Sequence, residues 1–408
     1  MSRAQKILFR IKRRLRKNIK LPIVFVIGVL LCFYPYVFSS VFHLGSETLV
    51  LLVTFLITFV WVVKSKGLFP ISVLLCIIIQ AAVWLAYVLI HADTSYVARV
   101  FFICYASLLL MLLLKKRLFI RFINTYNWFI ALQALLGVPV FFLYALGLLS
   151  PLAEFQNIDG RPLYFFGVTF SNMVMAGITR VAGFFDEPGA LASWGIFALV
   201  FNKLTVNNRK MEIILMVSLL FTLSAAYFIQ LALYVFFFYG TKAKTMISAA
   251  LILGIVGLFT FRYLGDNEQL RYLTVERFQG GTIRSSRNEM TVDAMKVFQE
   301  SPIIGIGARA LQERGYMDDN PFEIPAKDGI VGLLITYLPI LMVVFNKKCN
   351  NRMLLGALVL AAGYLQRPFH VNLLHYVMLY SFYLLRYYNK ANEFILRKAQ
   401  GVGRNRLL

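Results

Sequence analysis

The residues best suited to chemistry lie in one charged stretch, about Phe261 to Asp328, between two long apolar spans. It holds eleven of the chain's nineteen acids together with nine arginines and lysines. A guanidinium group binds phosphate oxygens through paired charged hydrogen bonds, and a carboxylate can take a proton from a hydroxyl group. A loop this long in an otherwise apolar chain is where function is expected. The stretch therefore predicts phosphate binding combined with proton transfer.

The same residues do not predict a metal site or a cofactor. The four cysteines form no Cys-x-x-Cys pair and no cluster with histidine. Several arginines are expected close to the outer membrane surface, where positive residues are normally depleted. Guanidinium groups there could supply the positive charge that a metal ion supplies in other enzymes. Several arginines without a metal motif therefore suggest a site for a lipid-linked phosphate or pyrophosphate.

Two shorter segments place arginines beside helix entrances. Arg180 precedes Glu187 and Pro188, and proline is suited to the first position of a helix. Arg284 and Arg287 begin a second segment that continues as an amphipathic helix. The apolar face of that helix is expected to contain Met290, Ala294, Val297 and Phe298.

A carboxylate near these arginines could deprotonate an acceptor hydroxyl group. We consider Asp319 the first choice, because it stands shortly before the next apolar span. Pro321 and Pro325 are expected to hold residues 318–323 extended rather than helical. The full set of candidate bases is Glu187, Asp318, Asp319 and Glu323.

The scaffold for these residues is predicted to be a polytopic membrane protein, all-α, with about twelve transmembrane helices. Hydrophobic residues make up 59% of the chain and charged residues only 15%, with a mean hydropathy of +0.71. A soluble core cannot hide so much apolar surface. Residues 211–240 are too long for one helix, and they are expected to form a tight pair that turns near Ser224. Pro139 should kink its helix without breaking it.

The net charge of +23 is explained by membrane topology. The segments expected inside hold twenty-nine lysines and arginines against two acids, and those expected outside hold thirteen against seventeen. By the positive-inside rule both termini are cytoplasmic, and nucleic-acid binding is not implied. The expected division is a basic cytoplasmic tail (1–20), transmembrane helices (21–264) with an outer loop (150–188), a large helical periplasmic loop (265–326), C-terminal transmembrane helices (327–385) and a basic cytoplasmic tail (386–408).

The order of these segments resembles that of the bacterial O-antigen polymerase and ligase superfamily, which includes the Wzy-type polymerases. The resemblance covers most of residues 100–385, and its individual motifs are short. The motifs are Arg180-x-x-Gly183-x-Phe185-x-Glu187-Pro188, Thr222-Leu-Ser224, Arg287 followed by Pro302-Ile-Ile-Gly305-Ile-Gly307, and Asp319-Asn320 before Asp328-Gly329-Ile-Val-Gly332.

The resemblance implies a GT-C-like helical fold and a metal-independent, inverting glycosyltransferase of the bacterial inner membrane, with a periplasmic active site. The donor would be a glycan on undecaprenyl pyrophosphate, and the acceptor the terminal sugar of another lipid-linked repeat unit in lipopolysaccharide biosynthesis. Arg180 and Arg287 match the family's two essential arginines. A chain-length regulator and a flippase are implied as partners.

The complete site expected from the residues and the resemblance has two parts. The catalytic residues would be Arg180, Arg287, Asp319 and Glu187. The substrate-binding residues would be Arg161, Arg284, Asp318, Asn320, Glu323 and Tyr316.

Three alternatives to a polymerase remain open at this point. Ligases, which transfer the glycan to lipid A-core, typically have His-Asn where this chain has Asp319-Asn320, and this departure favours a polymerase. A lipid-linked glycan transporter would need polar breaks at the bilayer midplane and often a repeated half, and only the break at Ser224 fits. A non-catalytic scaffold would leave the outer arginines without a role.

Overall fold

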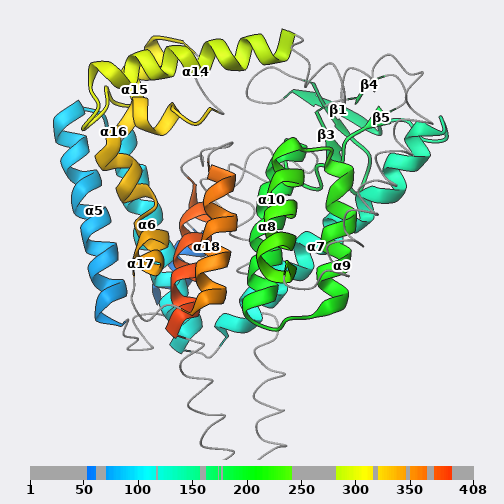
Figure 1. Ribbon diagram of the computed structural model, residues 1–408, viewed down its shortest axis with the longest axis horizontal. Helices are drawn as coiled ribbons and strands as arrows, with labels where there is room; N and C mark the ends of the chain where they lie inside the picture. Colours follow the sequence, from blue (N-terminus) through cyan, green and yellow to red (C-terminus); the bar gives the residue numbers. More distant parts are fainter. Residues whose placement is uncertain are drawn as a thin grey trace, which may run out of the picture.

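The computed structural model describes residues 53–60, 70–115, 118–156, 162–172, 174–175, 178–240, 282–315, 320–345, 350–364 and 372–387. Within these ranges the chain is mostly helical and carries five short strands. The helices stand side by side in a bundle, and one helix lies across the top of it (Figure 1).

Three of the described helices are long and apolar enough to cross a membrane. They are α5 (Ile71–His91), α6 (Ser95–Lys115) and α7 (Phe119–Ala145). As expected, Pro139 lies inside α7 and the helix continues through it. The turn between α5 and α6 is short, because Ala92 adopts a left-handed conformation that ends α5.

The predicted helix pair over residues 211–240 is confirmed. After α8 (Pro188–Leu204), the chain turns back into α9 (Arg209–Ser218) and the 3-10 helix η1 (Leu219–Thr222), and then α10 (Ala225–Tyr239) follows. The break occurs where Leu223 is left-handed, with a φ of 47°, and Ser224 is extended. The small polar residues around this point allow the chain to leave the helical conformation.

The C-terminal part contains a broken helix. Helix α16 (Glu323–Thr336) has a non-helical Gly329 inside it, and it meets α17 (Leu338–Val344) at a bend of 46°. Helix α18 (Asn351–Tyr364) and a last helix over residues 373–387 follow. If the bent pair counts as one span, the described residues hold four candidate spans. This is a helical membrane protein, and the expected spans near 22–42 and 245–264 lie outside the described residues.

Part of the outer loop is not helical, so the all-α expectation is wrong there. Strands β1 (Ala153–Gln156), β2 (Pro162–Phe165) and β3 (Phe170–Ser171) form an antiparallel sheet in that order. Strands β4 (Val174–Met175) and β5 (Ile178–Thr179) form a second antiparallel pair. Exposed and half-buried residues alternate along β1, which is the period of a strand.

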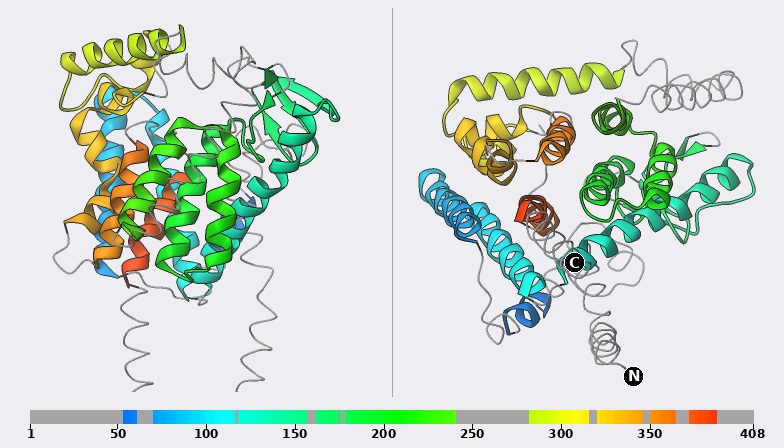
Figure 2. Two further views of the ribbon diagram at one scale, coloured as in Figure 1. Left: turned by 45° about the vertical axis from the view of Figure 1, so that its right-hand side comes forward. Right: turned by 60° about the horizontal axis from the view of Figure 1, so that its bottom comes forward.

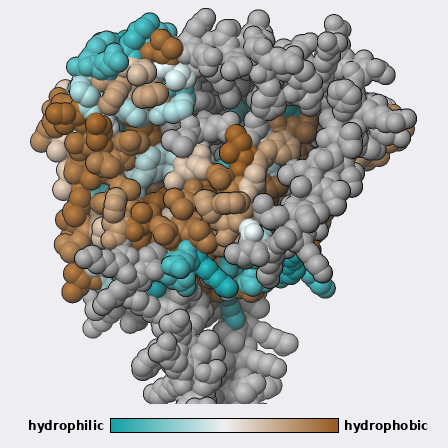
Figure 3. Space-filling view, in the orientation of Figure 1, coloured by the Kyte–Doolittle hydropathy of each residue, from teal (hydrophilic) through white to brown (hydrophobic). Residues whose placement is uncertain are grey.

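The loops expected outside and the turns expected inside lie at opposite ends of the bundle (Figures 1 and 2). The loop end, at the top of Figure 1, carries the strands, α14 (Thr282–Glu300) and α15 (Ala308–Glu313). The turn end, at the bottom, carries the α8–α9 turn, the end of α6 and the start of α7, and the end of α17 and the start of α18. An apolar band separates hydrophilic rims at the two ends (Figure 3), as expected for a membrane-embedded protein.

Candidate functional site

Arg180 is half-buried beside the break between η1 and α10. Its Nε donates a hydrogen bond to the Thr222 carbonyl at 2.9 Å, and its Nη2 donates to the Leu223 carbonyl at 3.4 Å. The next backbone N–H, of Val181, donates to the Phe221 carbonyl at 3.0 Å. Carbonyls at the end of a helix lack partners within that helix. The Arg180 stretch supplies them, and the two motifs that contain Arg180 and Thr222 are therefore in direct contact.

The chain between Arg180 and α8 is held in a fixed path by Gln133 of α7. The Gln133 Oε1 accepts a hydrogen bond from the Phe184 N–H at 2.9 Å. A side chain on Gly183, whose φ is +60°, would place its Cβ 2.7 Å from the same oxygen. Glu187 is the extended residue before α8, and Pro188 begins the helix as predicted.

The two glycine-containing motifs of the C-terminal half are interlocked. The segment that precedes α15 lies against the break in α16, so a side chain on Gly329, whose φ is +66°, would place its Cβ 2.3 Å from the Ile303 carbonyl oxygen. Only glycine fits both this space and this conformation. Four backbone hydrogen bonds join the segments, from the N–H groups of Ile306, Gly307, Ile330 and Val331 to the carbonyls of Ala326, Lys327, Pro302 and Ile303, respectively.

A buried ion pair lies beneath this interlock. Arg99 of α6 and Asp328 of α16 are 4% and 1% exposed, with 2.7 Å between Nη1 and Oδ2. The Tyr96 hydroxyl donates to Asp328 Oδ1 at 2.8 Å, and the Tyr87 hydroxyl donates to the Asp328 carbonyl at 2.7 Å. The guanidinium lies 4.2 Å from the centre of the Trp84 ring. The pair is opposite in charge, and its hydrogen bonds fix α16 against α5 and α6.

The α5–α6 turn also binds the start of α15. Asp93 accepts hydrogen bonds from the Ser95 N–H at 2.8 Å and from the Arg309 N–H at 3.0 Å. Burial alone would raise the pKa of Asp93, but these hydrogen bonds and the charge of Arg99 outweigh it and hold the pKa below its usual value. The carboxylate is thus kept charged at the loop end and anchors the segment that follows Gly307.

Asn320 and Glu323 begin α16. The Asn320 Oδ1 accepts a hydrogen bond from the Phe322 N–H at 2.8 Å, and Glu323 Oε1 accepts one from Lys327 Nζ at 2.8 Å. Glu323 is 3% exposed, and its Oε2 has no hydrogen-bond partner among the described residues. The expectation that residues 318–323 are extended is wrong at Glu323, which is already helical. Pro325 lies in the first turn, where its missing N–H costs nothing.

Helix α14 confirms the predicted amphipathic face. Ala294 and Val297 are buried in a small core with Leu311 and Ala326. Glu300 and Arg314 join the end of α14 to α15 through a 2.7 Å ion pair, and this hydrogen bond lowers the pKa of Glu300. The C-terminal half of α14 packs on α15 and α16. The N-terminal half of α14 extends over the bundle toward the strands (Figure 1).

The structure describes the side chains of some predicted site residues and only the backbone of others, and a third group lies outside the described residues. Arg180 and Glu187 precede α8, whereas Asn320 and Glu323 are at the start of α16, and these two helices lie on different sides of the bundle (Figure 1). Arg284 and Arg287 belong to the first turns of α14, where the backbone alone is described. Arg161, Tyr316, Asp318 and Asp319 lie outside the described residues.

Sequence reasoning missed the group around Arg99. Asp93, Tyr96 and Arg99 are spaced three residues apart at the start of α6, and all three contact the outer segments. The available signal was Arg99 itself, a charged residue inside an expected membrane span. Such residues are costly there and usually have a specific partner.

Comparison with protein-family models, curated proteins and solved structures found no match to this chain. The similarity to the polymerase and ligase superfamily therefore rests on the sequence motifs.

Proposed function

We propose that this protein is an O-antigen or polysaccharide polymerase, a glycosyltransferase that extends a glycan carried on undecaprenyl pyrophosphate. The observation that carries the proposal is that the motifs of the resemblance meet in pairs. Arg180 bonds the Thr222 and Leu223 carbonyls, forty-two and forty-three residues away. The Pro302–Gly307 motif bonds the segment around Asp328 and Gly329. The contacts between these motifs across the fold are what support the proposal.

In the proposed reaction, the bond between the donor sugar C1 and the pyrophosphate oxygen breaks. A hydroxyl oxygen of the acceptor sugar attacks C1 from the opposite face, which inverts the configuration. The hydroxyl proton passes to a base, and the negative charge develops on the leaving pyrophosphate. Groups fixed in advance around that charge lower the barrier most.

Arg180 is the described residue proposed to stabilise the leaving group. Its hydrogen bonds to the Thr222 and Leu223 carbonyls fix the plane of the guanidinium group. A fixed, planar cation needs little reorganisation when phosphate charge develops. Arg287, Arg284 and Arg161 are proposed to complete the cationic surface, with Tyr316, Asp318 and Asn320 binding the sugars.

Asp319, Glu323 and Glu187 are the proposed candidates for the base or for orienting the acceptor hydroxyl. Glu323 offers a specific geometry, because Lys327 holds Oε1 and leaves Oε2 to accept a further hydrogen bond. A carboxylate fixed through one oxygen can receive a proton on the other.

The proposal places the enzyme in the bacterial inner membrane with both termini in the cytoplasm and the site in the periplasm. Its substrates would be lipid-linked repeat units of lipopolysaccharide, delivered by a flippase, and a chain-length regulator would set product size. The GT-C-like arrangement of about twelve transmembrane helices is part of the same proposal. The apolar band in Figure 3 supports a membrane location.

The proposal is tested with purified protein and lipid-linked repeat units, with polymer length as the readout. Arg180→Lys and Arg287→Lys should each reduce the rate about thirty- to a thousand-fold, because an ammonium group cannot reproduce the guanidinium fork. Arg309→Lys is the matched control, since Arg309 is exposed and pairs with Glu313 on the surface. Parent activity in both Lys variants would contradict the proposal.

Two further measurements separate the remaining choices. In a deletion strain, single capped repeats indicate a polymerase, whereas long unattached polymer indicates a ligase. Asp319→Asn and Glu323→Gln keep the shape of each side chain and remove its basicity. The base is the residue whose variant loses activity between pH 6 and 8 while the melting temperature is retained. Parent rates in both would exclude these two carboxylates.

A further inference from the structure

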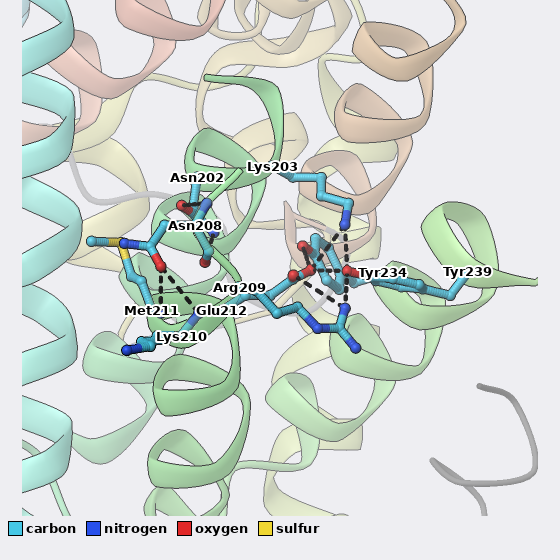
Figure 4. A network of polar contacts seen from close by, with 9 residues as sticks. All are labelled: Asn202, Lys203, Asn208, Arg209, Lys210, Met211, Glu212, Tyr234 and Tyr239. Atoms are coloured by element: carbon cyan, nitrogen blue, oxygen red, sulfur yellow. Dashed lines mark hydrogen bonds and ion pairs between the residues drawn. The ribbon is translucent and has the colours of Figure 1, made fainter. Parts of the chain in front are cut away.

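A second cluster of charges lies at the turn end, away from the proposed site. Figure 4 shows Lys203, Arg209, Tyr234 and Tyr239 converging on Glu212. Glu212 Oε1 accepts hydrogen bonds from the tyrosines at 2.6 and 2.5 Å and from Lys203 Nζ at 3.2 Å. Its Oε2 lies 3.5 Å from Arg209 Nη1. The carboxylate is fully buried, and it joins α8, α9 and α10.

The cluster carries more positive charge than its acid can neutralise. Lys203 and Arg209 both pair with Glu212, and Arg352 at the start of α18 is close enough to repel the charge of Lys203. Among the described residues, two cations thus pair with one carboxylate, and Arg352 adds a further positive charge to their surroundings. Like charges near a low-dielectric medium repel strongly unless an anion lies between them. The Arg209 side chain is 58% exposed, so an anion can approach from outside.

The surface next to the cluster is apolar and continues from Arg209 along α9. Ile213 and Val217 are 46% and 47% exposed. They follow Arg209 by four and eight residues, which places all three on one face of the helix. Lys210 is also exposed at the end of this stripe. A cationic end with an apolar stripe behind it matches the shape of a phospholipid, whose charged headgroup is joined to acyl chains.

We infer that the turn end holds a binding site for an anionic phospholipid. The phosphodiester contacts Arg209 and the neighbouring cations, and an acyl chain lies along Ile213 and Val217. Arg209 also donates a 2.6 Å hydrogen bond to the Tyr239 hydroxyl, so the headgroup meets a guanidinium that is already oriented. The lipid completes the charge balance of the α8–α9–α10 cluster and stabilises these helices together.

The site is tested by the thermal unfolding of the full chain in detergent micelles with increasing phosphatidylglycerol. Phosphatidylglycerol should raise the melting temperature, and phosphatidylcholine should not. Arg209→Gln should raise the phosphatidylglycerol concentration needed for half the effect by about tenfold, as expected for loss of a charged hydrogen-bond pair. A purely structural role would lower the melting temperature without changing that concentration.

Two variants and one salt complete the test. Arg309→Gln removes the same charge from an exposed position at the loop end, and it should leave the lipid response unchanged. Ile213→Gln combined with Val217→Gln should weaken the response with every cation retained. Inorganic phosphate should not replace the lipid. Equal responses in the parent and Arg209→Gln, or full stabilisation by phosphate alone, would overturn the inference.

Discussion

The two ends of the bundle bury a carboxylate in contrasting ways. At the loop end, Asp328 forms its ion pair with Arg99, whose charge also acts on Asp93, and the Tyr96 hydroxyl donates to the Asp328 carboxylate. At the turn end, Glu212 also receives tyrosine hydroxyls, but it pairs with two cations and a third lies nearby. The Arg99–Asp328 pair can be buried away from water, and it holds α16 against α6. The cluster around Glu212 has more cations than acids among the described residues, and its Arg209 is exposed to the external anion that we infer.

The largest effect is expected from breaking the Arg99–Asp328 pair. Asp328→Asn leaves a buried, unpaired guanidinium, so it should reduce the free energy of unfolding by about 3–5 kcal/mol. The double variant Arg99→Met, Asp328→Leu removes both charges and should recover more than half of this loss. Melting temperatures in detergent measure both. If Asp328→Asn is as stable as the double variant, the Arg99–Asp328 pair does not hold α16 against α6.

The next effect concerns the interlock above that pair. Gly329→Ala should destabilise the fold by about 1–3 kcal/mol through its positive φ alone, with the clash against the Ile303 carbonyl adding to it. Gly315→Ala is the control, because Gly315 also has a positive φ and nothing lies within 4 Å of the point that an added Cβ would occupy. Chemical denaturation of both variants isolates the clash. Equal losses of stability in Gly329→Ala and Gly315→Ala would show that the segments around Gly329 and Ile303 can move apart at little cost.

Breaking the cluster around Glu212 should reduce the free energy of unfolding less than breaking the Arg99–Asp328 pair does. Glu212→Gln keeps hydrogen-bonding atoms and removes the charge, so we expect a loss of about 1–3 kcal/mol. The variant should regain stability with phosphatidylglycerol more than the parent does, because its surplus of cations is larger. Asp328→Asn should show no such regain. A lipid response of the same size in both variants would remove the distinction between the two ends.

The smallest expected effect is the acid sensitivity of the loop end. The folded pKa of Asp93 lies below its unfolded value, so its stabilisation is complete above the ordinary aspartate pKa of about 3.9 and is lost as the pH falls through the folded pKa. The difference in melting temperature between the parent and Asp93→Asn should therefore be constant near neutral pH and shrink in acid. A constant difference down to about pH 3 would exclude this role.

Local patterns predicted much of the helical framework. The small polar residues around Ser224 indicated the helix break, Pro188 indicated the start of α8, and the spacing of Ala294 and Val297 indicated the buried face of α14. Each of these signals lies within a few residues of the feature that it predicts.

Features that depend on partners distant in the chain were not predictable in this way. The strands are two to four residues long, too short for a clear alternating pattern. Nothing local shows that Arg180 bonds the Thr222 carbonyl or that Arg99 pairs with Asp328. At the site, sequence reasoning could therefore select Arg180 and Glu323 by type and order, but it could not supply their contacts.

The Arg99–Asp328 pair also has a consequence for biosynthesis. The two residues are 229 positions apart, so at typical synthesis rates Asp328 emerges roughly 10–50 s after Arg99. During that interval α6 enters the bilayer before the carboxylate that pairs with Arg99 has been made. Arg99 is the fifth residue of α6, close enough to the start of the helix for its side chain to reach the lipid headgroups during this interval. Insertion of α16 then draws it inward, so the N-terminal helices reach their final depth only after the C-terminal third of the chain has been made.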